Sequence, residues 1–132
     1  MLYETLGSGL FVVRYRGSAD MAPGSQQGLI DAIRSAARAQ PVGIVFVIDD
    51  CVLKVDFSVP SFWLRVAADP AVRIAAMAMV TRSLAVEIAA RGFGAAVRFR
   101  TAPIEIRALE DEPSAVAWVR RLPSQAAAAT HA

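Results

Sequence analysis

Two adjacent carboxylates, Asp49 and Asp50, are the first residues whose type and position could support binding or catalysis. They follow residues 42 to 48, Val-Gly-Ile-Val-Phe-Val-Ile, an apolar run of strand length that is rich in β-branched side chains. Such a run is typical of a strand buried on both faces, so we interpret it as the central strand of a mostly parallel sheet. Open α/β sheets bind ligands at the carboxyl ends of their strands. Asp49 and Asp50 are therefore candidates for a ligand or partner surface, and solvation of the strand end is the alternative.

Cysteine and histidine, which many metal and catalytic sites use, are nearly missing from the chain. Cys51 is the only cysteine and His131 the only histidine, which excludes an intramolecular disulfide and a Cys/His zinc site. Gly92-Phe93-Gly94 lacks the third glycine of a dinucleotide-binding loop and follows a predicted helix, so we interpret it as a helix break. The sequence predicts no catalytic residues, no metal site and no cofactor, and we expect a protein that is not an enzyme.

Aromatic side chains cluster around a predicted helix start at residues 58 to 61, Ser-Val-Pro-Ser. Proline suits the first turn of a helix, and the helix is expected to run to about residue 68. Phe62 and Trp63 lie on its apolar face, so we expect them to fill the core. Together with Phe57 they are also candidates for a ligand or partner surface, which is the alternative interpretation.

The arginines carry most of the positive charge of the chain. The formal net charge is +2, and the basic residues are scattered rather than grouped in blocks, which does not predict a nucleic-acid partner. Residues 82 to 107 form the most basic stretch. Arg82 is a candidate contact there for an anion or an acidic partner, with an ordinary solvated surface as the alternative.

Composition limits the class of protein. The 132 residues, 55% of them hydrophobic, fit one globular domain with a real core. The apolar runs are far shorter than the ~20 residues that span a membrane, and the start, Met-Leu-Tyr-Glu, lacks the basic residues of a secretion signal. We expect a cytoplasmic protein without a membrane span. Because so apolar a chain exceeds what one small core can bury, we also expect a homodimer or a complex with another protein.

Strand and helix periodicities alternate along the chain. Residues 2 to 6 and 10 to 16 flank Gly7-Ser8-Gly9 and predict an antiparallel hairpin, with Arg14 and Arg16 on its more solvated face. Further strands are predicted at 42 to 49, 73 to 80 and 104 to 109, and helices at 25 to 39, 58 to 68, 84 to a break at Gly92, and 110 to 122.

These elements predict one α/β domain over residues 1 to 122. It has a single mixed sheet of about five strands, formed by an N-terminal hairpin followed by βα crossovers and covered by about four helices. Trp118 shares a helical face with other apolar residues and is expected to be buried against the sheet. Residues 123 to 132 are rich in alanine without aliphatic bulk and are predicted to be a disordered tail.

The order of these elements, with 73 to 80 as a core strand and 104 to 119 as the closing strand and helix, resembles the STAS domain of anti-sigma-factor antagonists. It is most similar to the SpoIIAA-like branch, many of whose members end in a similar pattern of two acidic residues, alanine and tryptophan. The resemblance covers about residues 1 to 122. In partner-switching STAS proteins a kinase phosphorylates a serine at the start of the helix that follows the central strand.

The resemblance implies that Ser58 is this switch serine and that Ser61 lies one turn further on. A phosphate there would be stabilised by the helix N-terminus, whereas the alternative role of the Ser58 hydroxyl is to cap the helix. The sequence departs from the family's motif at Phe57, where the family has aspartate, and at Pro60, where it has glycine.

We therefore expect a STAS-like regulatory protein-interaction domain, of the anti-sigma-factor-antagonist type, whose partner is a kinase or another regulator. The alternative is a carrier of a small apolar ligand or lipid, because the SpoIIAA-like branch also resembles CRAL-TRIO domains in design. A carrier needs an apolar pocket, lined here by Phe57, Phe62 and Trp63, whereas an interaction domain needs a filled core and exposed apolar side chains.

Overall fold

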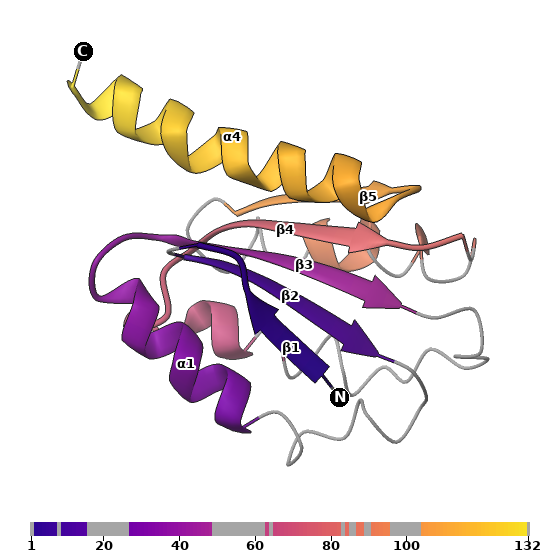
Figure 1. The fold of residues 1–132 in the computed structure, drawn as a ribbon, viewed down its shortest axis with the longest axis horizontal. Helices are drawn as coiled ribbons and strands as arrows, with labels where there is room; N and C mark the ends of the chain where they lie inside the picture. The colour runs from indigo at the N-terminus through magenta and orange to yellow at the C-terminus, as the bar shows by residue number, and fades with distance from the viewer. Residues whose placement is uncertain are drawn as a thin grey trace.

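Five strands form one mixed sheet in the order β1-β2-β3-β4-β5. The computed structural model describes residues 2–7, 9–15, 27–48, 63, 65–82, 84, 87–88, 91–95 and 104–131. The strands are β1 (Leu2–Thr5), β2 (Leu10–Tyr15), β3 (Val42–Ile48), β4 (Ile74–Val80) and β5 (Glu105–Leu109). β1 is antiparallel to β2, and the pairs from β2 to β5 are all parallel (Figure 1). The predicted mixed α/β sheet with an N-terminal hairpin is confirmed.

Glycine makes the hairpin turn between β1 and β2 possible. Gly7 has a φ of 70° and Gly9 a φ of 86°, which is the left-handed region that side chains with a Cβ avoid. The N–H of Leu6 donates to the carbonyl of Leu10 at 2.8 Å and closes the turn. The hairpin predicted from Gly7-Ser8-Gly9 is therefore confirmed.

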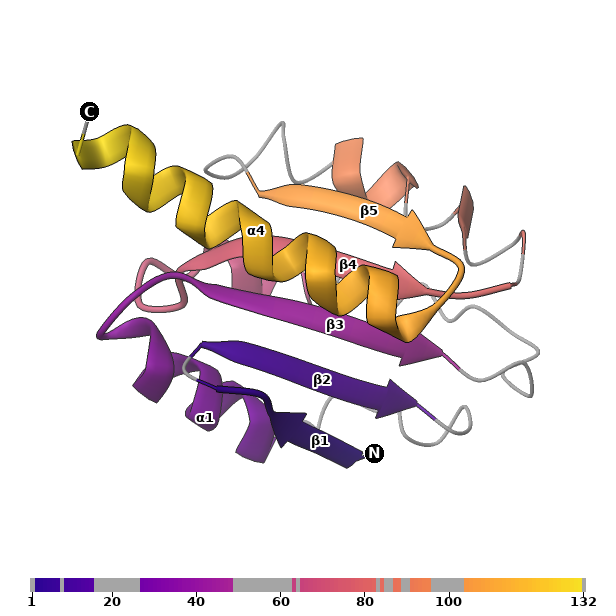
Figure 2. The same cartoon turned by 45° about the horizontal axis from the view of Figure 1, so that its top comes forward.

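Helices cover both faces of the sheet. They are α1 (Gln27–Ala37), the helical residues 63 and 65–68, the helical residues 84, 87–88 and 91–95, and α4 (Glu112–His131). Because β2 to β5 follow one another in one direction, right-handed crossovers place all three connecting helices on the same face. Figures 1 and 2 show α4 alone crossing the opposite face.

Side chains alternate between these two covered faces along each strand. On β2, Phe11, Val13 and Tyr15 belong to the core shared with α1, whereas Leu10 and Val12 belong to the core beneath α4. The core beneath α4 also contains the buried residues Val45, Ala76, Ala78, Ala115 and Val119. The uniformly apolar run predicted as the central strand is thus β3, buried on both sides.

A small residue lets α4 approach β3 closely. A Cβ added at Gly43 would overlap the Cγ1 methyl of Val119, which is 1% exposed. The helix thus rests directly on the backbone of the central strand at this point.

Several boundaries and environments differ from the sequence predictions. Residues 91–95 are helical, so Gly92 and Gly94 do not break the helix there. The strand predicted from residue 73 begins at Ile74. Arg73 is exposed instead, and its guanidinium donates to the carbonyl of Ala37, with Nε 2.9 Å away. This bond satisfies a carbonyl at the end of α1 that has no partner within the helix.

The C-terminal helix also differs from its prediction. α4 continues through Pro123 to His131 (Figure 1), where the sequence predicted a disordered tail from residue 123. Trp118 is half-buried rather than buried, and it packs at the side of the core beneath α4. Among the described residues, no helix combines the length and apolar character that crossing a membrane requires.

Candidate functional site

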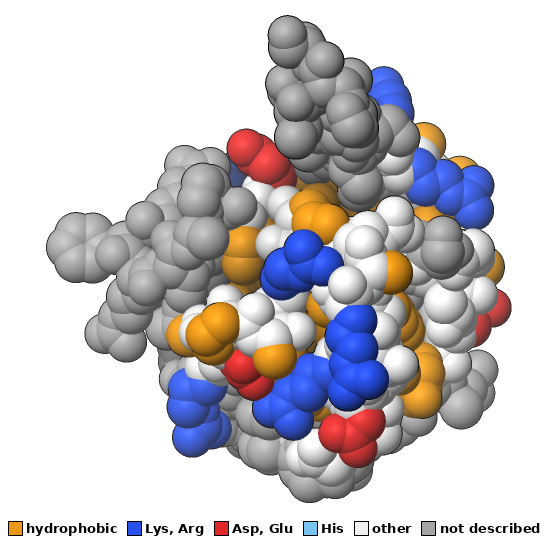
Figure 3. All heavy atoms as spheres, turned by 90° about the vertical axis from the view of Figure 1, so that its left-hand side faces the viewer, with side chains coloured by type: hydrophobic (Ala, Val, Ile, Leu, Met, Phe, Trp, Pro, Cys, Tyr) orange, Lys and Arg blue, Asp and Glu red, His pale blue; other side chains and the backbone are white. Residues whose placement is uncertain are grey.

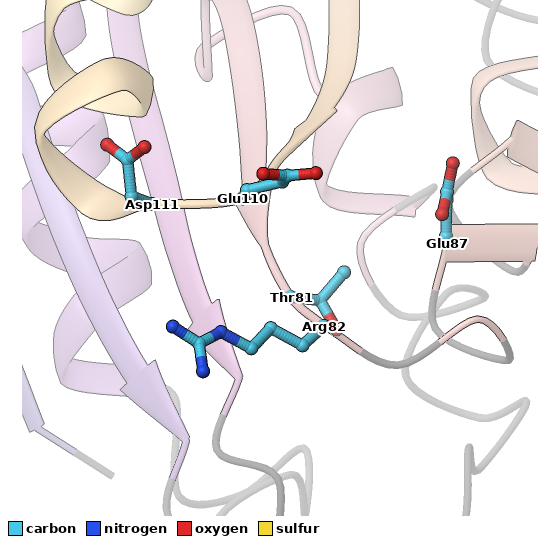
Figure 4. A pocket seen from close by; sticks show the side chains of 5 residues that line it. All are labelled: Thr81, Arg82, Glu87, Glu110 and Asp111. Carbon is cyan, nitrogen blue, oxygen red and sulfur yellow. The ribbon is translucent and has the colours of Figure 1, made fainter.

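A cleft of about 510 Å³ opens where β4 and β5 end, at the carboxyl edge of the sheet. Thr81 and Arg82 follow β4, Glu110 and Asp111 follow β5, and Glu87 lies on the helical residues after β4 (Figure 4). The N–H of Thr81 donates to the carbonyl of Leu109 at 3.2 Å. This bond extends the pairing of the two strands and holds the walls of the cleft together.

The cleft carries charges of both signs. Figure 4 shows the side chain of Arg82 extending away from Glu87, toward the side of the cleft where Asp111 lies. Arg82 and Glu110 are both exposed, and neither forms an ion pair with another residue in the described part of the chain. Both charges are therefore available to a ligand or partner.

Asp111 has a structural role that Glu110 lacks. Its carboxylate accepts a hydrogen bond of 2.8 Å from the N–H of Ser114 and caps the start of α4. This bond, with a further one from the Ser114 side chain, lowers the pKa of Asp111 below its ordinary value. The carboxylate of Asp111 is thus charged at neutral pH and fixed at the rim of the cleft.

The residue after Asp111 ties this edge to β2. Arg14 donates two hydrogen bonds to the carboxylate of Glu112, one of them 2.9 Å long, and a third, 3.0 Å long, to Glu4 on β1. These bonds lower the pKa of Glu112 and raise the pKa of Arg14. Arg14 is the least buried residue of β2, as the prediction of a more solvated face expects, but it is only half-exposed because α4 begins above it.

Two large aliphatic side chains are exposed on the helical residues that follow Arg82. Leu84 is 70% exposed and Ile88 is 60% exposed. The sequence marked both as apolar helix positions, but the buried side chain on this segment is Phe93. Leu84 and Ile88 instead form an apolar surface next to the cleft residue Glu87.

Trp63 lies in the core and not on a surface. It is 4% exposed, its Nε1–H donates to the hydroxyl of Tyr15 at 3.3 Å, and its ring meets Phe46 edge to face at 4.9 Å. Phe46 in turn stacks on Tyr15 at 6.1 Å. The expected core role of Trp63 is thereby confirmed.

The other candidate residues from the sequence lie outside the described residues. They are Asp49, Asp50, Phe57, Ser58, Ser61 and Phe62. Of the residues predicted to form a ligand or partner surface, Arg82 is therefore the only one that the structure places in the described cleft. No three His, Cys, Asp or Glu side chains among the described residues lie close enough together to hold a metal ion.

No local pattern in the sequence associates Arg82 with the other cleft residues, Thr81, Glu87, Glu110 and Asp111. The signal that could have found three of them is topological, because residues just after neighbouring parallel strands meet at one edge of the sheet. Glu110 and Asp111 were interpreted only as charges at a helix start. Asp111 does cap the start of α4, and both residues line the cleft as well.

Exposed arginines gather at the opposite end of the molecule, where the parallel strands begin (Figure 3). They include Arg34, which pairs with Asp69 at 2.9 Å, Arg38 just after α1, and Arg73. The fold thus collects at one end basic residues that are spread singly in the sequence.

No protein-family model matches the chain, and no curated protein matches it by sequence. Among solved structures, it is similar to a crystal structure of an uncharacterized protein of the DUF3478 family, with a SpoIIAA-like fold, from Shewanella loihica PV-4. The TM-score is 0.52 and the sequence identity 19%, over 89% of this chain and 90% of the other. The chain therefore has the SpoIIAA-like, STAS-type fold that the sequence resemblance implied.

Proposed function

We propose that this chain is a non-enzymatic regulatory domain that acts by binding another protein, in the manner of the anti-sigma-factor antagonists whose fold it shares. The cleft at the carboxyl edge carries the proposal. Arg82 and Glu110 present exposed charges of opposite sign there, and the exposed Leu84 lies two residues beyond Arg82. Apolar side chains beside oriented charges of both signs are typical of surfaces that recognise proteins.

The lining of the cleft supports a protein partner over a small apolar ligand. The five described residues that line the cleft are all polar or charged, whereas pockets for apolar ligands are lined mainly by hydrophobic and aromatic side chains. Trp63, which a lipid pocket would have used, packs against Phe46 and Tyr15. Both observations therefore favour a protein-interaction domain over a carrier of a small apolar ligand.

Switching of this binding by phosphorylation of Ser58 or Ser61 stays a prediction from the family resemblance. Under this prediction Ser58→Asp retains a helix cap and leaves stability nearly intact, but it abolishes binding to the partner that the unmodified protein holds. Equal partner affinity of the wild type and Ser58→Asp, with no phosphoserine at 58 or 61 in protein from its own cells, would remove the switch and leave the interaction domain.

Site-specific photo-crosslinking in the source cells tests the proposal. A photo-reactive phenylalanine analogue is placed at position 82 in one variant and at position 38 in the control, because Arg38 is equally exposed at the opposite end of the sheet. We expect an adduct with one defined protein from position 82 and none of that mass from position 38. Identical adducts from both positions, or none from position 82, would contradict the proposed partner surface.

A further inference from the structure

The helical residues 84, 87–88 and 91–95 have an inner and an outer face. Phe93 is 8% exposed and belongs to the core shared with α1. A Cβ added at Gly94 would lie 3.7 Å from Ile106 of β5. Leu84 and Ile88, four residues apart on the helix, point away from this packing and are 70% and 60% exposed. The inner face thus fixes the helix to the sheet, while the outer face carries aliphatic bulk in solvent.

The outer face continues with small residues. Gly92 follows Ile88 by four positions, and Ala95 follows Gly92 by three, so both share the face of Leu84 and Ile88. A Cβ added at Gly92 would meet no atom within 4 Å, and Ala95 is exposed. The face is therefore bulky near Leu84 and flat near Gly92.

The same face carries one charge of each sign. Glu87 and Arg91 form an ion pair of 2.9 Å, with side chains 40% and 77% exposed. A surface with a bulky end, a flat end and one charge of each sign is complementary to a copy of itself turned end for end. Isologous dimers require this property of their interfaces.

We propose that this outer face, formed by Leu84, Glu87, Ile88, Arg91, Gly92 and Ala95, binds the same face of a second copy of the chain, with the helices antiparallel about a two-fold axis at Ile88. Leu84 and Gly92 are each four residues from Ile88, so Leu84 of one copy lies over Gly92 of the other. Glu87 of one copy and Arg91 of the other are then offset by two residues along the helix axis, ~3 Å, which their side chains easily span.

This dimer goes beyond the proposed function, since it needs only this chain. Leu84 and Glu87 belong to both surfaces, but Arg82 and Glu110 lie outside the proposed helix pair. One pair of helices buries less than the ~1,200 Å² of standard stable interfaces. We therefore expect a reversible dimer with a Kd of about 10–100 µM, in the range of weak interfaces.

Sedimentation velocity of the purified full chain tests whether the dimer forms. We expect the sedimentation coefficient to rise from that of a monomer to that of a dimer as the concentration increases from about 5 to about 500 µM. Ile88→Asp places two carboxylates against each other at the axis and should raise the Kd at least about tenfold. A chain that stays monomeric over this range would overturn the proposal.

Disulfide trapping tests the location of the interface. In a Cys51→Ser background, Ile88→Cys should form an intermolecular disulfide many times faster than Tyr3→Cys, which replaces another exposed large apolar side chain, 42% exposed, on the edge strand β1. Equal rates for the two variants would overturn this interface even if the chain dimerises elsewhere.

A charge exchange tests whether Glu87 and Arg91 face the second copy. Glu87→Arg alone and Arg91→Glu alone each place like charges across the proposed interface and should weaken self-association. Mixing the two variants should restore a heterodimer, because every pair between the two copies is again of opposite sign while the pairs within each chain stay repulsive. Failure of the mixture to associate more tightly than either variant alone would overturn the placement of Glu87 and Arg91 in the interface.

Discussion

The ion-pair network of Arg14 shows what a single residue contributes to this fold. Its guanidinium links β2 to β1 through Glu4 and to the start of α4 through Glu112. The alternation along β2 correctly places Arg14 on the same side as Leu10 and Val12. The sequence could not show that this side is covered, because the covering helix begins 98 residues later along the chain. Local periodicity therefore predicted the side of the strand but not its environment.

The pairing of Glu112 predicts a pH-dependent stability. The pKa of Glu112 is lowered in the folded state, chiefly by the hydrogen bonds from Arg14. The stabilisation is thus fully present above the unfolded pKa and is lost as the pH falls through the lowered folded pKa. Glu112→Gln should cost about 1 kcal/mol at pH 7 and almost nothing near pH 2, as measured by urea unfolding.

The matched control for this measurement is Glu105→Gln, because Glu105 is an exposed carboxylate on β5. It should change the unfolding free energy by less than ~0.5 kcal/mol at either pH. A loss for Glu112→Gln that is the same at pH 7 and pH 2 would show that the ion pair does not contribute through its charge.

At the scale of elements, the long periodic segments were predictable and their ends were not. The alternation and apolar runs located all five strands within about two residues of their observed ends. Gly92 and Gly94 were misread as a helix break because glycine disfavours helices only by about 1 kcal/mol. Packing of Phe93 in the core shared with α1 offsets this cost. The extent of α4 beyond Leu122 was likewise not foreseen, because Pro123 usually ends a helix.

Trp118 illustrates the limit of helical periodicity. Ala115 and Val119 are buried beneath α4 as expected, but Trp118 is displaced by about 100° from Val119 around the helix and lies at the side of the contact. The period identifies a stripe of apolar residues. It does not show where the middle of that stripe falls, which depends on the position of the sheet beneath.

The contact between α4 and β3 predicts a strong effect of one methyl group. Gly43→Ala would drive a Cβ into Val119, whose β-branched side chain has one strongly preferred rotamer in a helix and cannot easily move aside. We expect a loss of roughly 1–3 kcal/mol in unfolding free energy, as for other overpacked cores. Adding Val119→Ala to Gly43→Ala should recover part of that loss, which a double-mutant cycle would measure.

Gly28→Ala is the control for this substitution. Gly28 lies on α1, and a Cβ there would meet no atom within 4 Å, so alanine should stabilise the protein by roughly 0.5–1 kcal/mol. If Gly43→Ala were as harmless as Gly28→Ala, α4 would not rest on β3 as described.

For the whole molecule, topology decides where a site can form. The sequence predicted a candidate binding surface at the carboxyl end of the central strand, and the cleft lies at the same edge of the sheet, at the ends of β4 and β5. Asp49 and Asp50 were candidates because they follow a predicted strand, whereas Arg82 was a candidate because it begins the most basic stretch of the chain. Glu110 and Asp111 were not associated with Arg82 because they come from the end of β5, nearly thirty residues further along the chain. Local patterns do not join such residues, whereas the order of the strands does.

The affinity of the purified chain for the partner identified by crosslinking at position 82 tests the central claim most directly. Titration of that partner is compared for the wild type, Arg82→Ala and Arg38→Ala, which remove one exposed arginine from opposite ends of the sheet. We predict that Arg82→Ala weakens binding at least about tenfold, the loss of one oriented charge in an interface, and that Arg38→Ala leaves it unchanged. Equal affinities for all three proteins, or a loss confined to Arg38→Ala, would contradict a partner surface at the carboxyl edge.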